Sequence, residues 1–116
     1  MHFTTEFDQL AQSLIWAASD GSDMVIDPDS RKRLQVEYES FCEILPEEFD
    51  PEDSCLTWGD PYEQFAHDYV LTRMHAGVGY WETSDWEKET GEHLTNLCRL
   101  QGTLLTYQVD NVLYIY

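Results

Sequence analysis

Apolar residues in the first half of the chain recur every three or four positions, the spacing of one face of an α-helix. The first stripe predicts a helix over residues 4–18, whose inward side chains are Phe7, Leu10, Leu14, Ile15 and Ala18. A second stripe follows Asp27 and Pro28, an N-cap residue and a residue favoured in the first turn. We therefore predict a second helix that ends at or near Pro46 and turns inward Leu34, Tyr38, Phe41 and Leu45.

The second half of the chain carries signals for a loop and two more helices. Residues 46–59 contain two prolines and no periodicity, which predicts a loop. Asp60 and Pro61 repeat the helix-opening signal, and Glu63 is placed to complete a capping box, so residues 61–75 form a third predicted helix.

A second capping box, Ser84 with Glu87, predicts that the last helix spans residues 85–101 and ends at Gly102. Its predicted inward side chains are Leu94, Leu97 and Cys98.

The end of the chain has the pattern of a β-hairpin. Two β-rich runs flank Asp110 and Asn111, residues that tolerate the left-handed conformation of a tight turn. Residues 77–81, GVGYW, are a candidate third strand.

We predict an α+β fold with about four helices and a small C-terminal antiparallel sheet. With 116 residues, near the commonest domain size, it forms one domain over 1–116.

Charge adds a strong constraint to this picture. The chain has 23 acidic and 6 basic residues, for a net charge of −17. Between Arg33 and Arg73 there are eleven acidic residues and no lysine or arginine. The negative electrostatic field of this chain opposes contact with a nucleic-acid backbone and attracts basic protein surfaces. The strongest basic surfaces in a cell are those that hold nucleic acid, so a basic nucleic-acid-binding protein is the expected partner and direct nucleic-acid binding is not expected.

Three glutamates form a line on the second predicted helix. Glu39, Glu43 and Glu47 occur at i, i+4 and i+8, about 6 Å apart at each step, on the face opposite the apolar stripe. That spacing approximates the spacing of phosphates along a nucleic-acid strand. The line continues into the predicted loop as Glu48, Asp50, Glu52 and Asp53, and the candidate anchoring aromatics beside it are Phe49, Trp58 and Tyr62.

The sequence gives no sign of a metal, cofactor or membrane segment. The cysteines, Cys42, Cys55 and Cys98, are odd in number and widely spaced, which indicates neither a disulfide framework nor a zinc site. The acids of residues 50–60 do not follow the EF-hand pattern. The N-terminus lacks a basic segment before a long apolar run, so we expect a cytoplasmic protein without cofactors.

Residues 66–82, AHDYVLTRMHAGVGYWE, resemble a run of the form G-H-D-F-W-L-T-R-N-G-H-G-x-G-F-W-D in small uncharacterised proteins of bacteriophages and prophages. The matching residues are His67, Asp68, Leu71, Thr72, Arg73, Gly77, Gly79 and Trp81, with conservative changes at Tyr69, Tyr80 and Glu82. The departures are Met74, His75 and Ala76 in place of Asn-Gly-His. The resemblance covers roughly the C-terminal half and implies origin on a phage or mobile element. It implies no activity.

His67, Asp68 and Arg73 are also candidates for a catalytic set, with Arg73 paired to Asp68 or to Glu82. Adjacent residues on a helix project about 100° apart, which is poor geometry for a base and its orienting carboxylate. A buried polar cluster that joins the helix to the sheet is the structural alternative. We favour the structural alternative and predict no catalytic residue.

Together these features predict a phage- or mobile-element-encoded inhibitor that is not an enzyme. It would act as a DNA mimic against a restriction, CRISPR-type or nucleoid protein of the host. One alternative is a phage accessory protein that binds a host protein through a non-acidic face. Another is a small enzyme that uses His67, Asp68 and Arg73. The sequence leaves the oligomeric state open.

Overall fold

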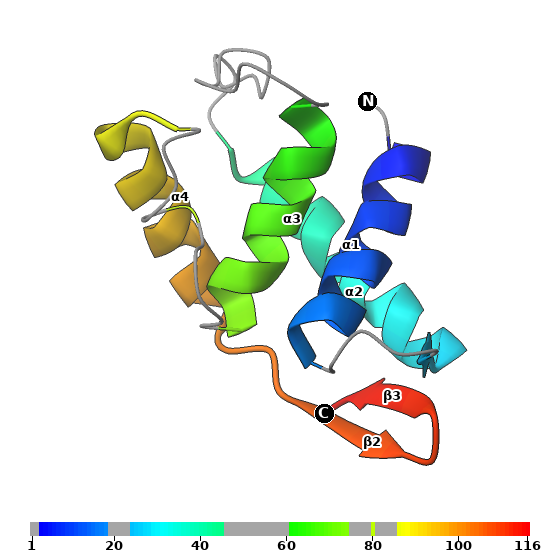
Figure 1. The fold of residues 1–116 in the computed structure, drawn as a ribbon. Coiled ribbons are helices and arrows are strands. Elements are labelled where there is room, and N and C mark those ends of the chain that lie inside the picture. The colour runs from blue at the N-terminus through cyan, green and yellow to red at the C-terminus, as the bar shows by residue number, and fades with distance from the viewer. Residues whose placement is uncertain (1–2, 19–23, 46–60, 75–79, 81–85) are drawn as a thin grey trace.

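A computed structural model describes residues 3–18, 24–45, 61–74, 80 and 86–116 (Figure 1). The elements in chain order are α1 (Phe3–Ala18), β1 (Val25–Ile26), α2 (Pro28–Glu43), α3 (Pro61–Met74), α4 (Lys88–Gln101), β2 (Thr106–Val109) and β3 (Val112–Ile115). The predicted α+β class is confirmed. None of these four helices is long and apolar enough to cross a membrane.

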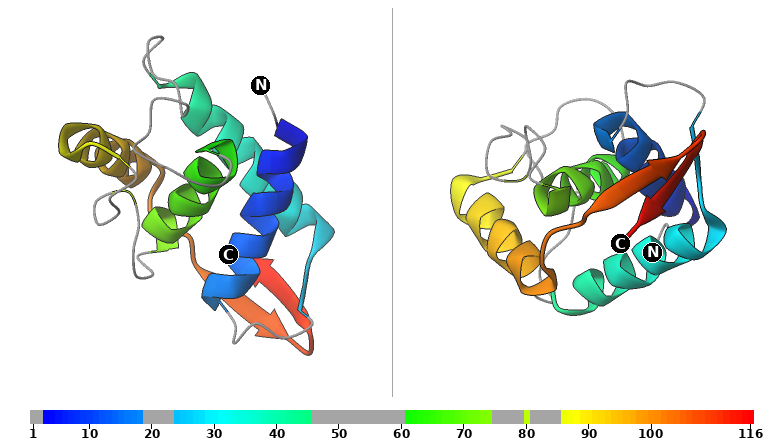
Figure 2. Two further views of the ribbon diagram at one scale, coloured as in Figure 1. Left: turned by 45° about the horizontal axis from the view of Figure 1, so that its top comes forward. Right: turned by 90° about the horizontal axis from the view of Figure 1, so that it is seen from below.

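The helices enclose an aromatic core, and the sheet lies at one end of the molecule. α1 and α3 lie side by side, α2 passes behind them, and α4 flanks α3 on its other side (Figures 1 and 2). The largest rings of the core belong to Tyr38, Phe41, Phe65, Tyr69, Tyr80 and Trp86. Their centroids approach to 4.7 Å between Phe41 and Tyr69 and to 5.7 Å between Phe65 and Trp86. Aromatic burial on this scale dominates the energetics of a small core.

The sheet has the strand order β1-β3-β2. β2 and β3 form the predicted C-terminal hairpin, and Asp110 takes the left-handed conformation at its turn, with φ 55°. The candidate third strand over residues 77–81 lies outside the described residues apart from Tyr80, which is in a turn. In the part of the chain that the structure describes, the third strand is β1, which runs parallel to β3, so this sheet is mixed and not purely antiparallel as predicted. Two residues are too short a strand to show any alternation in sequence.

Helix boundaries test the predicted caps. Asp27 caps α2 by accepting a hydrogen bond from the Ser30 amide at 3.0 Å, as predicted. Gly102 ends α4 with φ 81°, also as predicted. The capping box at Ser84 and Glu87 is wrong as the start of α4, because the N-cap is Glu87 itself and its side chain makes no capping bond.

Trp86 directly precedes the N-cap residue of α4. Its ring is buried in the core, and its indole nitrogen donates to Asp68 at 2.7 Å. The predicted cap of α3, Asp60, lies outside the described residues.

Replacement of Asp27 by alanine tests the cap of α2. Asp27→Ala removes the acceptor for the Ser30 amide and should lower the free energy of unfolding by about 1 kcal/mol. Asp27→Asn keeps a capping oxygen and should lose much less. Urea unfolding followed by circular dichroism measures both. Equal stability of wild type and Asp27→Ala would show that this cap does not stabilise the helix.

Candidate functional site

Arg73, in the last turn of α3, lies at the centre of a buried polar cluster. Its side chain is only 2% exposed. Nη1 donates to Glu37 Oε1 at 2.7 Å and to the Tyr69 hydroxyl at 3.1 Å. Nε donates to the Gly102 carbonyl at 2.9 Å and Nη2 to the Gln101 carbonyl at 3.1 Å. A lysine could not satisfy these four acceptors, because they require the planar fork of a guanidinium.

Glu37 is the anionic partner in this cluster, and it comes from α2. Partial burial acts to raise the pKa of Glu37, but hydrogen bonds from Arg73 and Arg33 outweigh it and hold that pKa below its usual value. Gln101 adds a link by donating to the Glu37 carbonyl at 2.7 Å. The cluster therefore joins α2, α3 and the end of α4. The predicted pairing of Arg73 with Asp68 is wrong, and Glu82 lies outside the described residues.

Asp68 and His67 have different neighbours from Arg73 and from each other. Asp68 is 1% exposed and accepts from Trp86 Nε1 at 2.7 Å and from Gln64 Nε2 at 2.9 Å. His67 Nδ1 lies 2.6 Å from Ser13 Oγ on α1. Burial lowers the pKa of His67, so its imidazole is neutral at pH 7. The three candidate catalytic side chains thus have three separate sets of hydrogen-bond partners and do not converge on one point.

The Ser13–His67 pair has the residue types of a nucleophile and its base, but not their accessibility. Ser13 is 1% exposed and accepts a further hydrogen bond from Gln9 Nε2 at 2.9 Å. A nucleophile must reach the substrate, and a hydroxyl buried between two helices does not. This pair joins α1 to α3.

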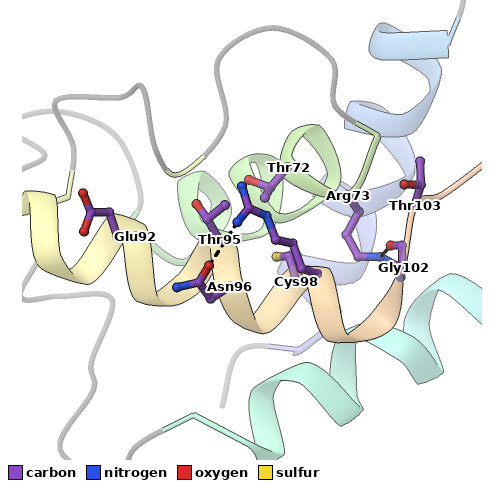
Figure 3. A pocket seen from close by; sticks show the side chains of 9 residues that line it. Thr72, Arg73, Glu92, Thr95, Asn96, Cys98, Gly102 and Thr103 are labelled. Carbon is purple, nitrogen blue, oxygen red and sulfur yellow. Dashed lines mark hydrogen bonds between the residues drawn. The ribbon is translucent and has the colours of Figure 1, made fainter.

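A pocket of about 460 Å³ lies between α3 and α4 (Figure 3). It is lined by Thr72, Arg73, Glu92, Thr95, Asn96, Cys98, Arg99, Gly102 and Thr103. Internal hydrogen bonds occupy two of its three threonine hydroxyls, since Thr72 donates to the Asp68 carbonyl at 2.6 Å and Thr95 to the Gly91 carbonyl at 2.8 Å. Burial raises the pKa of the Cys98 thiol to about 12, so it is not a thiolate at neutral pH.

The lining residues that the structure describes therefore offer no activated nucleophile in this pocket. Within the described part of the chain, no three histidine, cysteine, aspartate or glutamate side chains come together as a metal site.

Charge is distributed unevenly from one end of the molecule to the other. The last turns of α2 and the first turns of α3 and α4 lie opposite the β2–β3 hairpin (Figure 1). We call this the acidic end, because these turns carry Glu39, Glu43, Glu63, Glu87, Glu89 and Glu92. The first turns of α2 and the last turns of α3 and α4 lie at the sheet end, with Arg31, Lys32, Arg33, Arg73 and Arg99. The exceptions are Lys88, at the start of α4, and three acids at the sheet end, Asp27, Asp29 and Asp110.

The ion pairs among the described residues follow the same division. Arg31 pairs with Asp8 at 3.0 Å, and Arg33 and Arg73 both pair with Glu37 at 2.7 Å. In the described ranges no ion pair reaches Glu39 or Glu43. These two side chains also lie at the negative end of the α2 dipole, where the last turn has no basic residue. Within the part of the chain that the structure describes, the end of α2 is therefore a local concentration of carboxylates without ion-pair partners.

Only part of the predicted partner-binding surface can be placed. Glu43 is exposed, and Glu39 and Tyr62 are half-buried. α2 ends at Glu43, so the helical line of carboxylates is two residues long where the structure describes it. The other predicted residues, Glu47, Glu48, Phe49, Asp50, Glu52, Asp53 and Trp58, lie outside the described residues.

Comparison of the chain with protein-family models, with curated proteins and with solved structures found no match.

Arg73→Met tests whether the buried cluster stabilises the fold. The substitution keeps the apolar stem but removes the donors for Glu37 and for the two carbonyls at the end of α4. We expect a loss of about 3–5 kcal/mol in the free energy of unfolding, measured in urea. Arg99→Met removes an exposed arginine and should change stability by less than about 0.5 kcal/mol. A similarly small loss for Arg73→Met would contradict the role given to the cluster.

The lowered pKa of His67 predicts how the stability of the fold depends on pH. Because burial lowers its pKa, protonation favours the unfolded chain, and its contribution to stability is lost as pH falls below the unfolded value of about 6.5. The stability of wild type relative to His67→Gln should therefore fall between about pH 7.5 and about pH 5.5. Parallel chemical denaturation of the two proteins at each pH measures this difference. A difference independent of pH would contradict a half-buried, neutral imidazole.

Proposed function

We propose that this chain is an acidic inhibitor that occupies the nucleic-acid-binding surface of a basic host protein. The observation that supports the proposal most strongly is the separation of charge. Basic residues gather and pair at the sheet end, whereas the acidic end has carboxylates without basic partners among the described residues. A protein whose charge served solubility alone would have mixed signs over its whole surface.

The acidic end has the properties that electrostatic recognition requires. Successive carboxylates such as Glu39 and Glu43 stand one helical turn apart, about 6 Å, which approximates the spacing of phosphates on a strand. The separation of charge also orients the molecule as it approaches, because a positive groove attracts one end and not the other. The carboxylates would then replace DNA by competition, without chemistry or a cofactor.

Restriction enzymes, CRISPR-type nucleases and nucleoid proteins are the proposed partner classes, because each holds nucleic acid in a strongly basic groove. The resemblance of residues 66–82 to small phage and prophage proteins supports an origin on a mobile element. Action in the host cytoplasm follows from that origin. Binding energy beyond steering would come from aromatic anchors beside the acids, for which Phe49, Trp58 and Tyr62 are the proposed residues.

Capture from a bacterial lysate tests the class of partner. A tagged form of the chain should retain a basic nucleic-acid-binding protein at low salt, and competing duplex DNA or added salt should release it. A partner that stays bound through high salt and excess DNA would contradict mimicry.

A pair of matched double variants tests the surface. Glu39→Gln with Glu43→Gln removes two charges from the acidic end, and Asp29→Asn with Asp110→Asn removes two exposed charges at the sheet end. If each charge at the acidic end contributes about 0.5–1 kcal/mol, the first variant should bind the captured partner roughly five- to thirtyfold more weakly. Most of this change should lie in the association rate, which surface plasmon resonance measures. The second variant should lose less than about threefold. Equal losses would show that net charge, and not this surface, determines affinity.

A further inference from the structure

The face of the sheet that points away from the helices is apolar. Alternation along the strands places Leu113 and Ile115 in the core and sends their neighbours to the other side. We call that side the outer sheet face, and its residues are Val25, Leu105, Tyr107, Val109, Val112, Tyr114 and Tyr116. A sheet with one face in solvent normally carries polar residues on that face. None of these seven side chains is charged.

The tyrosines on this face form an ordered cluster. The rings of Tyr107 and Tyr114 stack with centroids 5.0 Å apart, and Tyr116 packs against Tyr107 at 4.8 Å. Three contacts hold the sheet at this edge of the helices. Ser30 Oγ accepts from the Ile115 amide at 3.0 Å, Arg33 donates to the Tyr116 backbone oxygen, and β1 pairs with β3 directly before the N-cap residue of α2, Asp27. The apolar face is therefore a fixed surface and not a set of separate side chains.

The size of this face suits a protein interface. Val25, Leu105, Tyr107, Val109 and Tyr116 are each 41–65% exposed. Together they present roughly 550 Å² of mostly apolar surface, near the upper end for the largest patch on a monomeric protein. Two such faces in contact would bury roughly 1,100 Å², which reaches the threshold of about 1,000 Å² for a specific interface.

Charge makes the sheet end the place where a second copy of this chain can approach. A net charge of −17 makes two copies repel each other over most of their surface. From Gly102 to Tyr116 the only charged side chain is Asp110, and in the first turns of α2 the carboxylates of Asp27 and Asp29 offset Arg31, Lys32 and Arg33, so this end carries little net charge. Contact through the sheet end also places the two acidic ends at opposite poles of the pair, where their repulsion is weakest.

We infer that the outer sheet face is the contact surface of a homodimer, in which the sheets of two copies stack face to face about a two-fold axis. The contact is isologous and therefore closes at two copies. Tyr107 and its stacked neighbours lie at its centre. Each dimer then presents two acidic ends, directed away from each other. This inference does not depend on the proposed function, because it concerns the opposite end of the molecule.

Sedimentation equilibrium of the full chain tests the dimer. The mass should rise from 13.6 kDa towards twice that value as protein concentration increases from about 1 µM to about 1 mM. The dimer should tighten as salt rises from about 50 to about 500 mM, because screening reduces repulsion and leaves apolar contact intact. Binding at the acidic end has the opposite salt dependence. A mass of 13.6 kDa under all these conditions, or growth beyond two copies, would overturn the inference.

Three single substitutions locate the interface. Val109→Glu and Leu105→Glu each place a buried charge in the dimer but a solvated one in the monomer, so each should weaken the dimer by about tenfold or more. Val36→Glu, at an exposed apolar position on α2, should leave the dimer unchanged. Circular dichroism of each variant verifies that it is folded. A dimer that survives both sheet substitutions, or that Val36→Glu weakens equally, would overturn the assignment.

The double variant Glu39→Gln with Glu43→Gln separates the two proposals. It should retain or slightly tighten the dimer while it weakens partner binding. Loss of the dimer in this variant would place the self-contact at the acidic end and contradict the inference.

Discussion

The buried guanidinium of Arg73 is the interaction on which the rest of the structure depends. It connects α3 to Glu37 on α2 and to the carbonyls of Gln101 and Gly102 at the end of α4. The backbone of the same residue accepts from the Leu104 amide at 2.9 Å, which directs the chain from α4 towards the hairpin. An arginine that is 2% exposed must have its donors satisfied, so the arrangement of the ends of α3 and α4 against the middle of α2 is tightly constrained.

This constraint also shapes the surface. Arg73 and Arg33 neutralise Glu37 at the sheet end, and Arg31 neutralises Asp8. Few basic residues remain for the other acids, and they do not pair with Glu39 or Glu43 in the described ranges. Among the described residues, Lys88 is therefore the one lysine or arginine at the acidic end. An acidic end and, at the opposite end, an apolar sheet face suit two different contacts, one with a basic partner and one with a second copy.

Local signals in the sequence predicted local structure well and long-range contacts poorly. The Asp27 cap, the stop at Gly102 and the turn at Asp110 depend on a few neighbouring residues, and all three are confirmed. β1 was missed because its pairing with β3 joins Val25 to Val112, far apart in the chain. The partners of Arg73 and Asp68 were missed for the same reason, since α2 and Trp86 reach them only in the folded state. The apolar outer face did leave a signal, because VLYIY is a continuous apolar run, typical of a strand covered on both sides.

Amide chemical-shift mapping with a short arginine-rich peptide tests most directly whether the acidic end is the contact surface. Spectra of the isotope-labelled chain are recorded at low salt as the peptide is added, and they report the chemical shift of each backbone amide. The largest shift changes should lie in the last turns of α2, around Glu39 and Glu43, and in the first turn of α3 around Glu63. Amides of Arg31–Arg33 and of the hairpin should stay nearly unchanged, and added salt should reverse the effect. Shift changes spread evenly over all helices, or centred on the hairpin, would contradict the account.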